Sequence, residues 1–210
     1  MPAPASSVTV ATRSQRPSSA ELLAEFERSW GGRSDLWVFG YASLIWRPEF
    51  DAAEHRSALV YGWHRSLRMR STVNRGTPER PGLVFALLRG GACQGAVYRI
   101  PRARVRQELQ RLWLREMPNG VYDPRWVQAR TPQGVVPALA FTLSSRSPAC
   151  LPPLSDASML DILTHARGRF GTTLDYLLET HHALRQRGIR DREIARWVLL
   201  AQRHGLSPAR

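Results

Sequence analysis

A glutamate on the apolar side of a predicted helix is the residue of this chain best placed to do chemistry. The segment 101–117, PRARVRQELQRLWLREM, is expected to form a helix that Pro101 opens at its first position and that residues 118–120, Pro-Asn-Gly, stop. At about 100° per residue, Glu116 falls about 20° from Val105, in the middle of the apolar stripe. A carboxylate there either pairs with a cation or lies in a low-dielectric pocket that raises its pKa. The second environment is what a general base or acid near neutral pH requires.

The same glutamate also has a simpler explanation. If the helix frays at Met117, Glu116 reaches solvent, and it could equally pair with one of the many arginines of the chain. Helical periodicity alone leaves both explanations open.

A second candidate is the segment Gly40-Tyr41-Ala42-Ser43-Leu44, where an apolar run ends in small residues. Small side chains let a ligand approach the backbone, and successive exposed N–H groups can hold a carboxylate or an oxyanion. A tight turn capped by Ser43 would explain the same residues. Taken alone, this pattern is a weak indication of a site.

Charge and composition limit the possible partners. The 210 residues carry a net charge of +13, and all thirty basic residues are arginine. Such a surface attracts anions, either nucleic acid or small acidic substrates. The arginines are scattered, and there is no zinc module, RNP-like motif or basic strand studded with aromatic residues, so we expect no nucleic-acid partner.

The remaining composition is that of an ordinary globular protein, with 43% hydrophobic residues. There is no run of about 20 apolar residues and no apolar core in the N-terminal segment, so we expect neither a membrane span nor a secretory signal. Two cysteines, Cys93 and Cys150, are too few for a disulfide scaffold and lack metal-ligand spacing. We therefore predict a cytoplasmic protein without a metal.

The coarse pattern predicts an α+β fold in which a mixed or barrel-like sheet precedes a helical C-terminal part. We expect a disordered leader over residues 1–19 and a single domain over 20–210. Ser19 is predicted to cap the first helix, and Gly90-Gly91 to form the turn of a hairpin. The other expected elements are a buried strand in LWVFG, two strands around Pro132-Gln133-Gly134, and helices over 156–167, 173–187 and 191–204.

Four segments, in this order and spacing, resemble one known family: VFGYASLIW, RSTVNRGTPERPGLVFALLRGGACQGAVYRI, LWLREMPNGVY and GTTLDYLLETHHALRQRGIRD. They are similar to the ChaC-like γ-glutamylcyclotransferases, the glutathione-specific branch of the cyclotransferase superfamily. The resemblance covers about residues 35–200. One departure is Ala42, which stands where the family usually has glycine. If that position needs a positive φ, alanine adds strain there.

The resemblance implies cleavage of glutathione into 5-oxoproline and cysteinylglycine without a cofactor, on a small mixed barrel-like sheet flanked by helices. It implies that Glu116 is catalytic, the same residue that the periodicity selects. It also implies that substrate contacts come from one turn and one helical tyrosine, namely Tyr41, Ala42, Ser43, Leu44, Ile45, Trp46 and Tyr176.

Two arginines beside Gly-Thr-Pro-Glu, Arg75 and Arg80, are candidates for gripping the glycyl carboxylate of glutathione, although a solvated loop would also explain them. The alternative within enzymes is a cyclotransferase for other γ-glutamyl amines or dipeptides. The oligomeric state stays open at this point.

Overall fold

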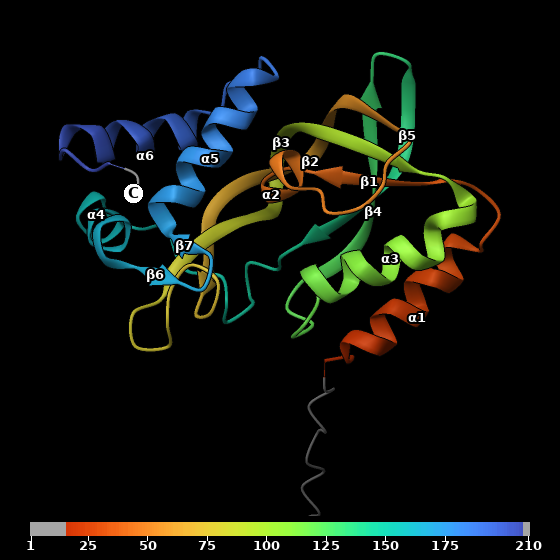
Figure 1. Cartoon of the computed structure of the whole chain (residues 1–210), viewed down its shortest axis with the longest axis horizontal. Coiled ribbons are helices and arrows are strands. Elements are labelled where there is room, and N and C mark those ends of the chain that lie inside the picture. Colours follow the sequence, from red (N-terminus) through yellow and green to blue (C-terminus); the bar gives the residue numbers. More distant parts are fainter. Residues whose placement is uncertain (1–15, 208–210) are drawn as a thin grey trace, which may run out of the picture.

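A five-stranded barrel with helices on two sides organises the computed structural model, which describes residues 16–207 (Figure 1). The expected α+β class, with a small mixed barrel and a helical C-terminal part, is confirmed. The strands of the barrel are β1 (Leu36–Gly40), β2 (Glu54–Ser71), β3 (Gly82–Ile100), β4 (Asp123–Thr131) and β5 (Gly134–Thr142). The helices are α1 (Ser19–Trp30), α2 (Ser43–Trp46), α3 (Arg102–Glu116), α4 (Asp156–His165), α5 (Thr173–Gln186) and α6 (Arg192–Arg203). A small two-stranded ribbon, β6 (Arg167–Gly168) and β7 (Gly171–Thr172), precedes α5.

The barrel closes in the order β1-β3-β2-β4-β5. The pairing of β1 with β5, through Trp37 with Ala138 and Val38 with Leu139, is parallel, and the other pairings are antiparallel. This parallel pair makes the sheet mixed. Within residues 16–207, each strand of this ring has a hydrogen-bonded neighbour on both sides, although β1 with β5 and β2 with β4 pair through two residue pairs each.

The hairpin predicted around Gly90-Gly91 is wrong. Both glycines lie inside β3, which continues through them and pairs along its length with β2. The register shifts between Tyr61 and Trp63, opposite these glycines, and Gly62, Gly90 and Gly91 all have positive φ. The glycines therefore serve a bulge that bends both long strands, not a chain reversal.

The predicted helix starts need small corrections. Ser18, not Ser19, caps α1, and it forms a capping box with Glu21. Pro101 is the residue before α3 and not its first helical residue. The three C-terminal helices and the β4–β5 hairpin lie where they are predicted, within two residues.

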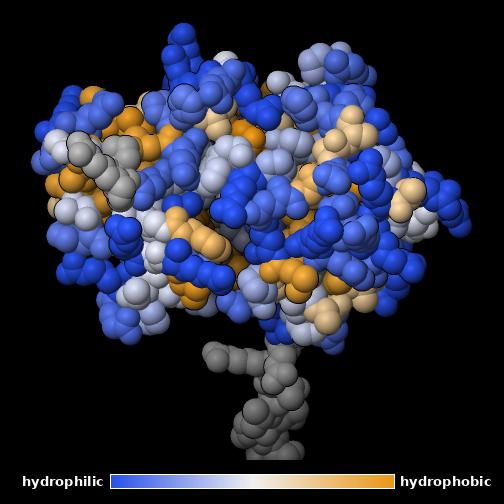
Figure 2. Space-filling view, in the orientation of Figure 1, coloured by the Kyte–Doolittle hydropathy of each residue, from blue (hydrophilic) through white to orange (hydrophobic). Residues whose placement is uncertain are grey.

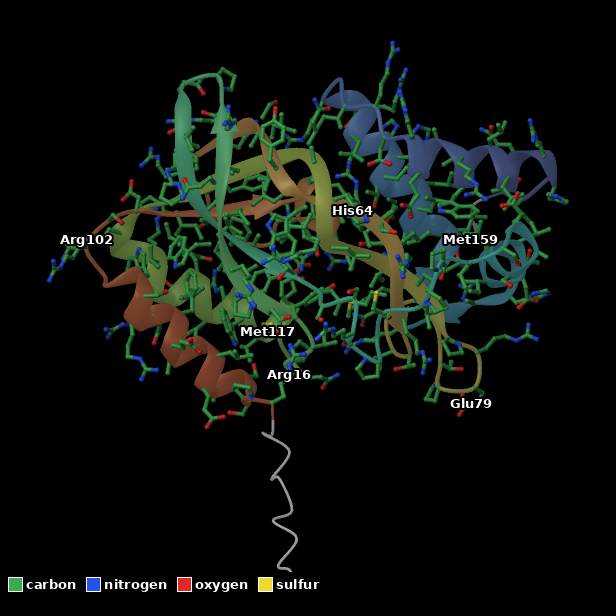
Figure 3. All side chains as sticks on the ribbon, turned by 180° about the vertical axis from the view of Figure 1, so that it is seen from behind. Arg16, His64, Glu79, Arg102, Met117 and Met159 are labelled. Atoms are coloured by element: carbon green, nitrogen blue, oxygen red, sulfur yellow. The ribbon has the colours of Figure 1, made fainter. Side chains whose placement is uncertain are left out.

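Of the predicted leader 1–19, residues 1–15 lie outside the described part of the chain. Arg16 pairs with Asp123 at 2.9 Å, and the hydroxyl of Ser19 donates to the carbonyl oxygen of Met117 at 2.6 Å. Figure 3 shows Arg16 and Met117 at the end of the molecule where α1 begins and α3 ends. The start of α1 is therefore tied to the end of α3.

Two apolar cores hold the helices on the barrel. Phe26 of α1 and Leu109 of α3 pack with Phe141 of β5 on one side. Leu177 of α5 and Trp197 of α6 pack with strand residues on the other side. Hydrophilic residues cover most of the face seen in Figure 2, and hydrophobic residues appear there as separate patches. Within residues 16–207, no helix is both long and apolar enough to cross a membrane.

Arg65 of β2 joins three parts of the structure. Its side chain is only 2% exposed, and its guanidinium pairs with Asp191, the N-cap of α6, at 2.8 Å. It also donates to the carbonyl oxygens of Gln94 and Tyr41. The barrel, the helical part and the segment after β1 thus share one buried cation.

We expect Arg65→Met to lower the free energy of unfolding by about 3–5 kcal/mol, because it leaves Asp191 and two inward carbonyl groups without their donor. Arg196→Met is the matched control, since Arg196 pairs with Asp156 on the surface, where both side chains are more than half exposed. Its cost should stay within about 1 kcal/mol. Urea unfolding of the two variants measures the difference, and equal costs would contradict this role of Arg65.

Candidate active site

A pocket at the end of β1 gathers most of the residues that the sequence singles out. Its lining comes from the segment after β1, from β3 and β5, from the end of α3, from the segment between α3 and β4, and from α5. The lining residues are Tyr41, Ala42, Ser43, Leu44, Phe85, Glu116, Tyr122, Phe141 and Tyr176.

Glu116 is the carboxylate of this pocket. It is the last residue of α3, and its side chain is 15% exposed. The pKa of Glu116 is raised from its ordinary value, chiefly by burial. The Arg115 guanidinium, 3.0 Å away, lowers this pKa, and the negative charge of Glu49 raises it further. Both explanations left open by periodicity therefore hold in part, because the carboxylate is buried and is also paired.

Close packing at the end of β1 leaves no room for side chains at two glycine positions. A Cβ atom at Gly40 would meet the Tyr98 ring at 3.0 Å and Leu44 at 3.1 Å, so glycine is needed where the strand ends. Gly95 on β3 is equally restricted, since its Cβ would lie 2.3 Å from the Gly40 carbonyl oxygen. The first turn of α2 leaves the N–H groups of Ser43 and Leu44 without helical acceptors.

Ala42 does not have the positive φ that was considered for this position. Its φ is −143°, outside the left-handed region that favours glycine. The strain considered for a positive φ is therefore not present at this position.

Three buried tyrosines face the carboxylate. The Tyr41 hydroxyl donates to the carbonyl oxygen of Phe141 at 3.0 Å, and the Tyr176 hydroxyl accepts from the Phe85 N–H at 3.4 Å. Burial, with the negative charge of Glu116 adding to it, raises the pKa of Tyr41 and of Tyr122 well above the ordinary value. Burial likewise raises the pKa of Tyr176 to about 12. The three hydroxyls are therefore neutral near pH 7.

Two of the residues expected to bind substrate do not line the pocket. Ile45 is buried in the core, 5% exposed, and its carbonyl oxygen accepts from Tyr98 at 3.3 Å. Trp46 packs edge-on against the Tyr176 ring, with the centroids 6.2 Å apart, and its indole N–H donates to Thr180 at 3.3 Å. These two residues support the lining from behind.

Three lining residues were not predicted. Tyr122 lies two residues after the helix stop at 118–120, so its closeness in sequence to Glu116 could have suggested it. Phe85 and Phe141 lie in apolar strands, where nothing in the pattern separates a pocket residue from a core residue.

The two arginine candidates differ. Arg75 is 6% exposed, its guanidinium lies 5.1 Å from the centroid of the Tyr176 ring, and it pairs with Glu179 at 3.5 Å. Arg80 is exposed to solvent. The solvated-loop explanation thus fails for Arg75. Among residues 16–207, no group of three or more histidine, cysteine, aspartate or glutamate side chains could hold a metal ion.

The barrel and its helices have the fold of solved γ-glutamylcyclotransferases. A crystal structure described as a yeast γ-glutamylcyclotransferase specific to glutathione superimposes with a TM-score of 0.73, at 21% identity, covering 82% of this chain and 97% of that one. The chain belongs to the ChaC-like protein family, whose sequence model matches residues 36–202.

Relatives of this chain include proteins named glutathione-specific gamma-glutamylcyclotransferase. The Escherichia coli relative is 36% identical over 157 residues, which cover 74% of this chain and 68% of the relative. The human relative, named glutathione-specific gamma-glutamylcyclotransferase 1, is 33% identical over 160 residues, which cover 74% of this chain and 72% of the relative.

The raised pKa of Glu116 has a consequence for stability. A carboxyl group whose pKa is higher in the folded than in the unfolded state stabilises the fold when protonated, and this contribution is lost as the pH rises through the folded value. Glu116→Gln cannot ionise, so we expect it to be more stable than the native chain at pH 7.5 and to lose that advantage near pH 4.

Thermal unfolding at both pH values tests this, since about 1 kcal/mol moves Tm by about 2–4 °C in a chain of this size. Glu25→Gln, at an exposed position of α1, is the control and should give the same small change at both pH values. A Glu116→Gln variant less stable than the native chain at pH 7.5 would contradict the net effect of burial.

Proposed function

We propose that this protein is a γ-glutamylcyclotransferase that cleaves glutathione into 5-oxoproline and cysteinylglycine. Membership of the ChaC-like family and the names of the relatives support the reaction class and the substrate. The observation that carries the proposal for the site is the buried carboxylate of Glu116, which lines one pocket with the turn over residues 41–44.

The reaction joins two groups of one molecule. In the γ-glutamyl part of glutathione, the α-amine nitrogen attacks the γ-carbonyl carbon, a C–N bond closes a five-membered lactam, and the bond to the cysteine nitrogen breaks. Holding the chain folded in the pocket supplies much of the acceleration, because well-oriented intramolecular reactions gain about 7–11 kcal/mol. The proposed place for this folded form is the pocket between the turn and the tyrosines.

Glu116 moves the proton. The α-nitrogen arrives as an ammonium ion with three protons and keeps one in the lactam, so two protons must leave it. The second is lost to solvent after the C–N bond forms, and the ionised carboxylate takes the first, which frees the lone pair for attack. The same group, now an acid, gives that proton to the departing amine of cysteinylglycine. Backbone N–H groups of Ser43 and Leu44 are our candidates for stabilising the negative charge that develops on the γ-carbonyl oxygen.

Substrate recognition includes the carboxylates of glutathione. Arg75 is our candidate for the glycyl end, because its buried guanidinium lies 5.1 Å from the centroid of the Tyr176 ring, and Tyr176 is a lining residue. A reducing, cytoplasmic compartment stays a prediction, supported by the free thiols of Cys93 and Cys150.

The direct test is incubation with glutathione and detection of 5-oxoproline and cysteinylglycine by mass spectrometry. The native chain should form both in equal amounts. Failure to form 5-oxoproline from glutathione, with activity on γ-glutamyl-alanine instead, would move the substrate to other γ-glutamyl compounds and leave the reaction type intact.

Glu116→Gln should retain the fold and lose turnover by about 10²–10⁴-fold, because the amide has the same shape and cannot accept the proton. Glu25→Gln should retain full turnover. A Glu116→Gln variant that keeps more than about a tenth of the native kcat would remove Glu116 from the role of base.

N-acetyl-glutathione should bind and yield no product. Its nitrogen lone pair is delocalised into the acetyl carbonyl and cannot attack the γ-carbonyl carbon. We expect it to inhibit cleavage of glutathione competitively. Release of cysteinylglycine from the acetylated compound at a comparable rate would mean that another nucleophile, water or a side chain, performs the attack.

A further inference from the structure

Arg115 forms a bridge beside the catalytic candidate. Its Nε lies 3.0 Å from Oε1 of Glu116, and its Nη1 lies 3.0 Å from Oε2 of Glu49. The same Nη1 donates to the backbone carbonyl oxygen of Arg47. The Arg115 side chain is 19% exposed, so this guanidinium is mostly shielded from water. One planar group thus connects the end of α3 to the segment that follows α2.

Glu49, at the other end of the bridge, has an unusual backbone conformation and a second arginine contact. Among the non-glycine residues that the structure describes, Glu49 alone has a positive φ, 56°, which costs energy for a side chain of this kind. Its carboxylate contacts the guanidinium of Arg47 as well as that of Arg115. Arg47 directly follows α2, whose first residues line the pocket. The backbone thus keeps a strained residue at the point where it can hold Arg115.

We propose that Arg115 is a positioning residue for the cyclotransferase reaction: it fixes the orientation of the Glu116 carboxylate and keeps it ionised, while Glu49 and the Arg47 carbonyl fix Arg115. This inference rests on the proposed function. Arg115 does not line the pocket and acts on the substrate through Glu116.

The charge balance around Glu116 explains why such a residue is needed. Burial alone favours the protonated carboxyl group, which cannot act as a base. Arg115 opposes burial, and Glu49, the other charged group acting on Glu116, favours protonation. The groups facing it from the other elements are the neutral hydroxyls of Tyr41, Tyr122 and Tyr176.

Orientation is a separate contribution from charge. The Nε and Nη1 atoms of a guanidinium are fixed in one plane, so a hydrogen bond to Glu49 determines where the other bond can point. A lysine ammonium at position 115 would keep the positive charge and could not hold both carboxylates in this geometry.

The test is the pH dependence of glutathione cleavage. The acidic limb of kcat/KM reports the base in the free enzyme. In Arg115→Gln we expect this limb to move to higher pH, so that kcat/KM falls about tenfold more at acidic than at alkaline pH, the size of effect that a close opposite charge produces. In Arg115→Lys the limb should stay near its native position, and kcat should fall at every pH.

Arg104→Gln is the matched control, because Arg104 lies on the same helix and pairs with Asp51 in a solvent-exposed position. It removes the same charge and should leave the profile unchanged. If the acidic limb of Arg115→Gln stays at its native pH, the proposal is overturned, because Arg115 then does not control the ionisation of Glu116. If only KM changes in this variant, the proposal is also overturned, because Arg115 then contributes to substrate binding. An Arg104→Gln profile shifted like that of Arg115→Gln would also overturn it, because net charge would then suffice.

A second readout separates this inference from the proposed function. Titration of ¹³C-labelled glutamate carboxyl groups by NMR should give a higher pKa for Glu116 in Arg115→Gln than in the native chain. This rise in the pKa of Glu116 is expected even if glutathione is not the substrate. If the pKa of Glu116 is the same in Arg115→Gln as in the native chain, the inference is overturned, whatever the substrate is. If Arg115→Gln does not fold, Arg115→Lys decides: native kcat with a native profile contradicts the positioning role.

Discussion

The buried guanidinium of Arg65 is the interaction on which the arrangement of the site depends. It lies inside the molecule and donates to the Tyr41 carbonyl, to the Gln94 carbonyl of β3 and to Asp191 at the start of α6. A buried cation with three partners from distant parts of the chain allows few alternative arrangements, because each partner left unpaired would cost free energy. The turn on one side of the pocket and the helical part that carries Tyr176 are therefore held in a fixed relation.

The opposite side of the pocket depends on the way α3 ends. The indole N–H of Trp113 and the carbonyl of Met117 both bond to Ser19 at the start of α1, which anchors the last turn of α3. Glu116 lies within this anchored turn, so the backbone that carries its carboxylate is held in place, and Arg115 contacts the carboxylate itself at 3.0 Å. The proposed base and the proposed substrate-binding turn are thus both held in place, which an intramolecular cyclisation requires, since the reacting geometry has to be held by the protein.

The part of the site that could be predicted is the part with a local or family signature. Helical periodicity selects Glu116, and the segment after β1 is recognisable from its small residues and from the family resemblance. Periodicity could not show that Arg115 reaches Glu116, because adjacent residues of a helix point in different directions. It also could not show that Glu49, from outside the helix, contacts the same guanidinium.

The errors in the fold have the same origin. Two apolar runs separated by Gly90-Gly91 have the pattern of a hairpin, and only the long-range pairing with β2 decides that they are one bent strand. Phe85 and Phe141 were not found as pocket residues because alternation along a strand identifies the buried face and does not show where that face leaves a space.

Cleavage of glutathione in water enriched in ¹⁸O shows directly whether the α-amine or water attacks the γ-carbonyl carbon. Attack by the α-amine uses no water, so we expect 5-oxoproline and cysteinylglycine that both lack ¹⁸O. Released glutamate whose γ-carboxylate carries one ¹⁸O would contradict this mechanism, because water would then be the nucleophile in place of the amine that Glu116 is proposed to deprotonate.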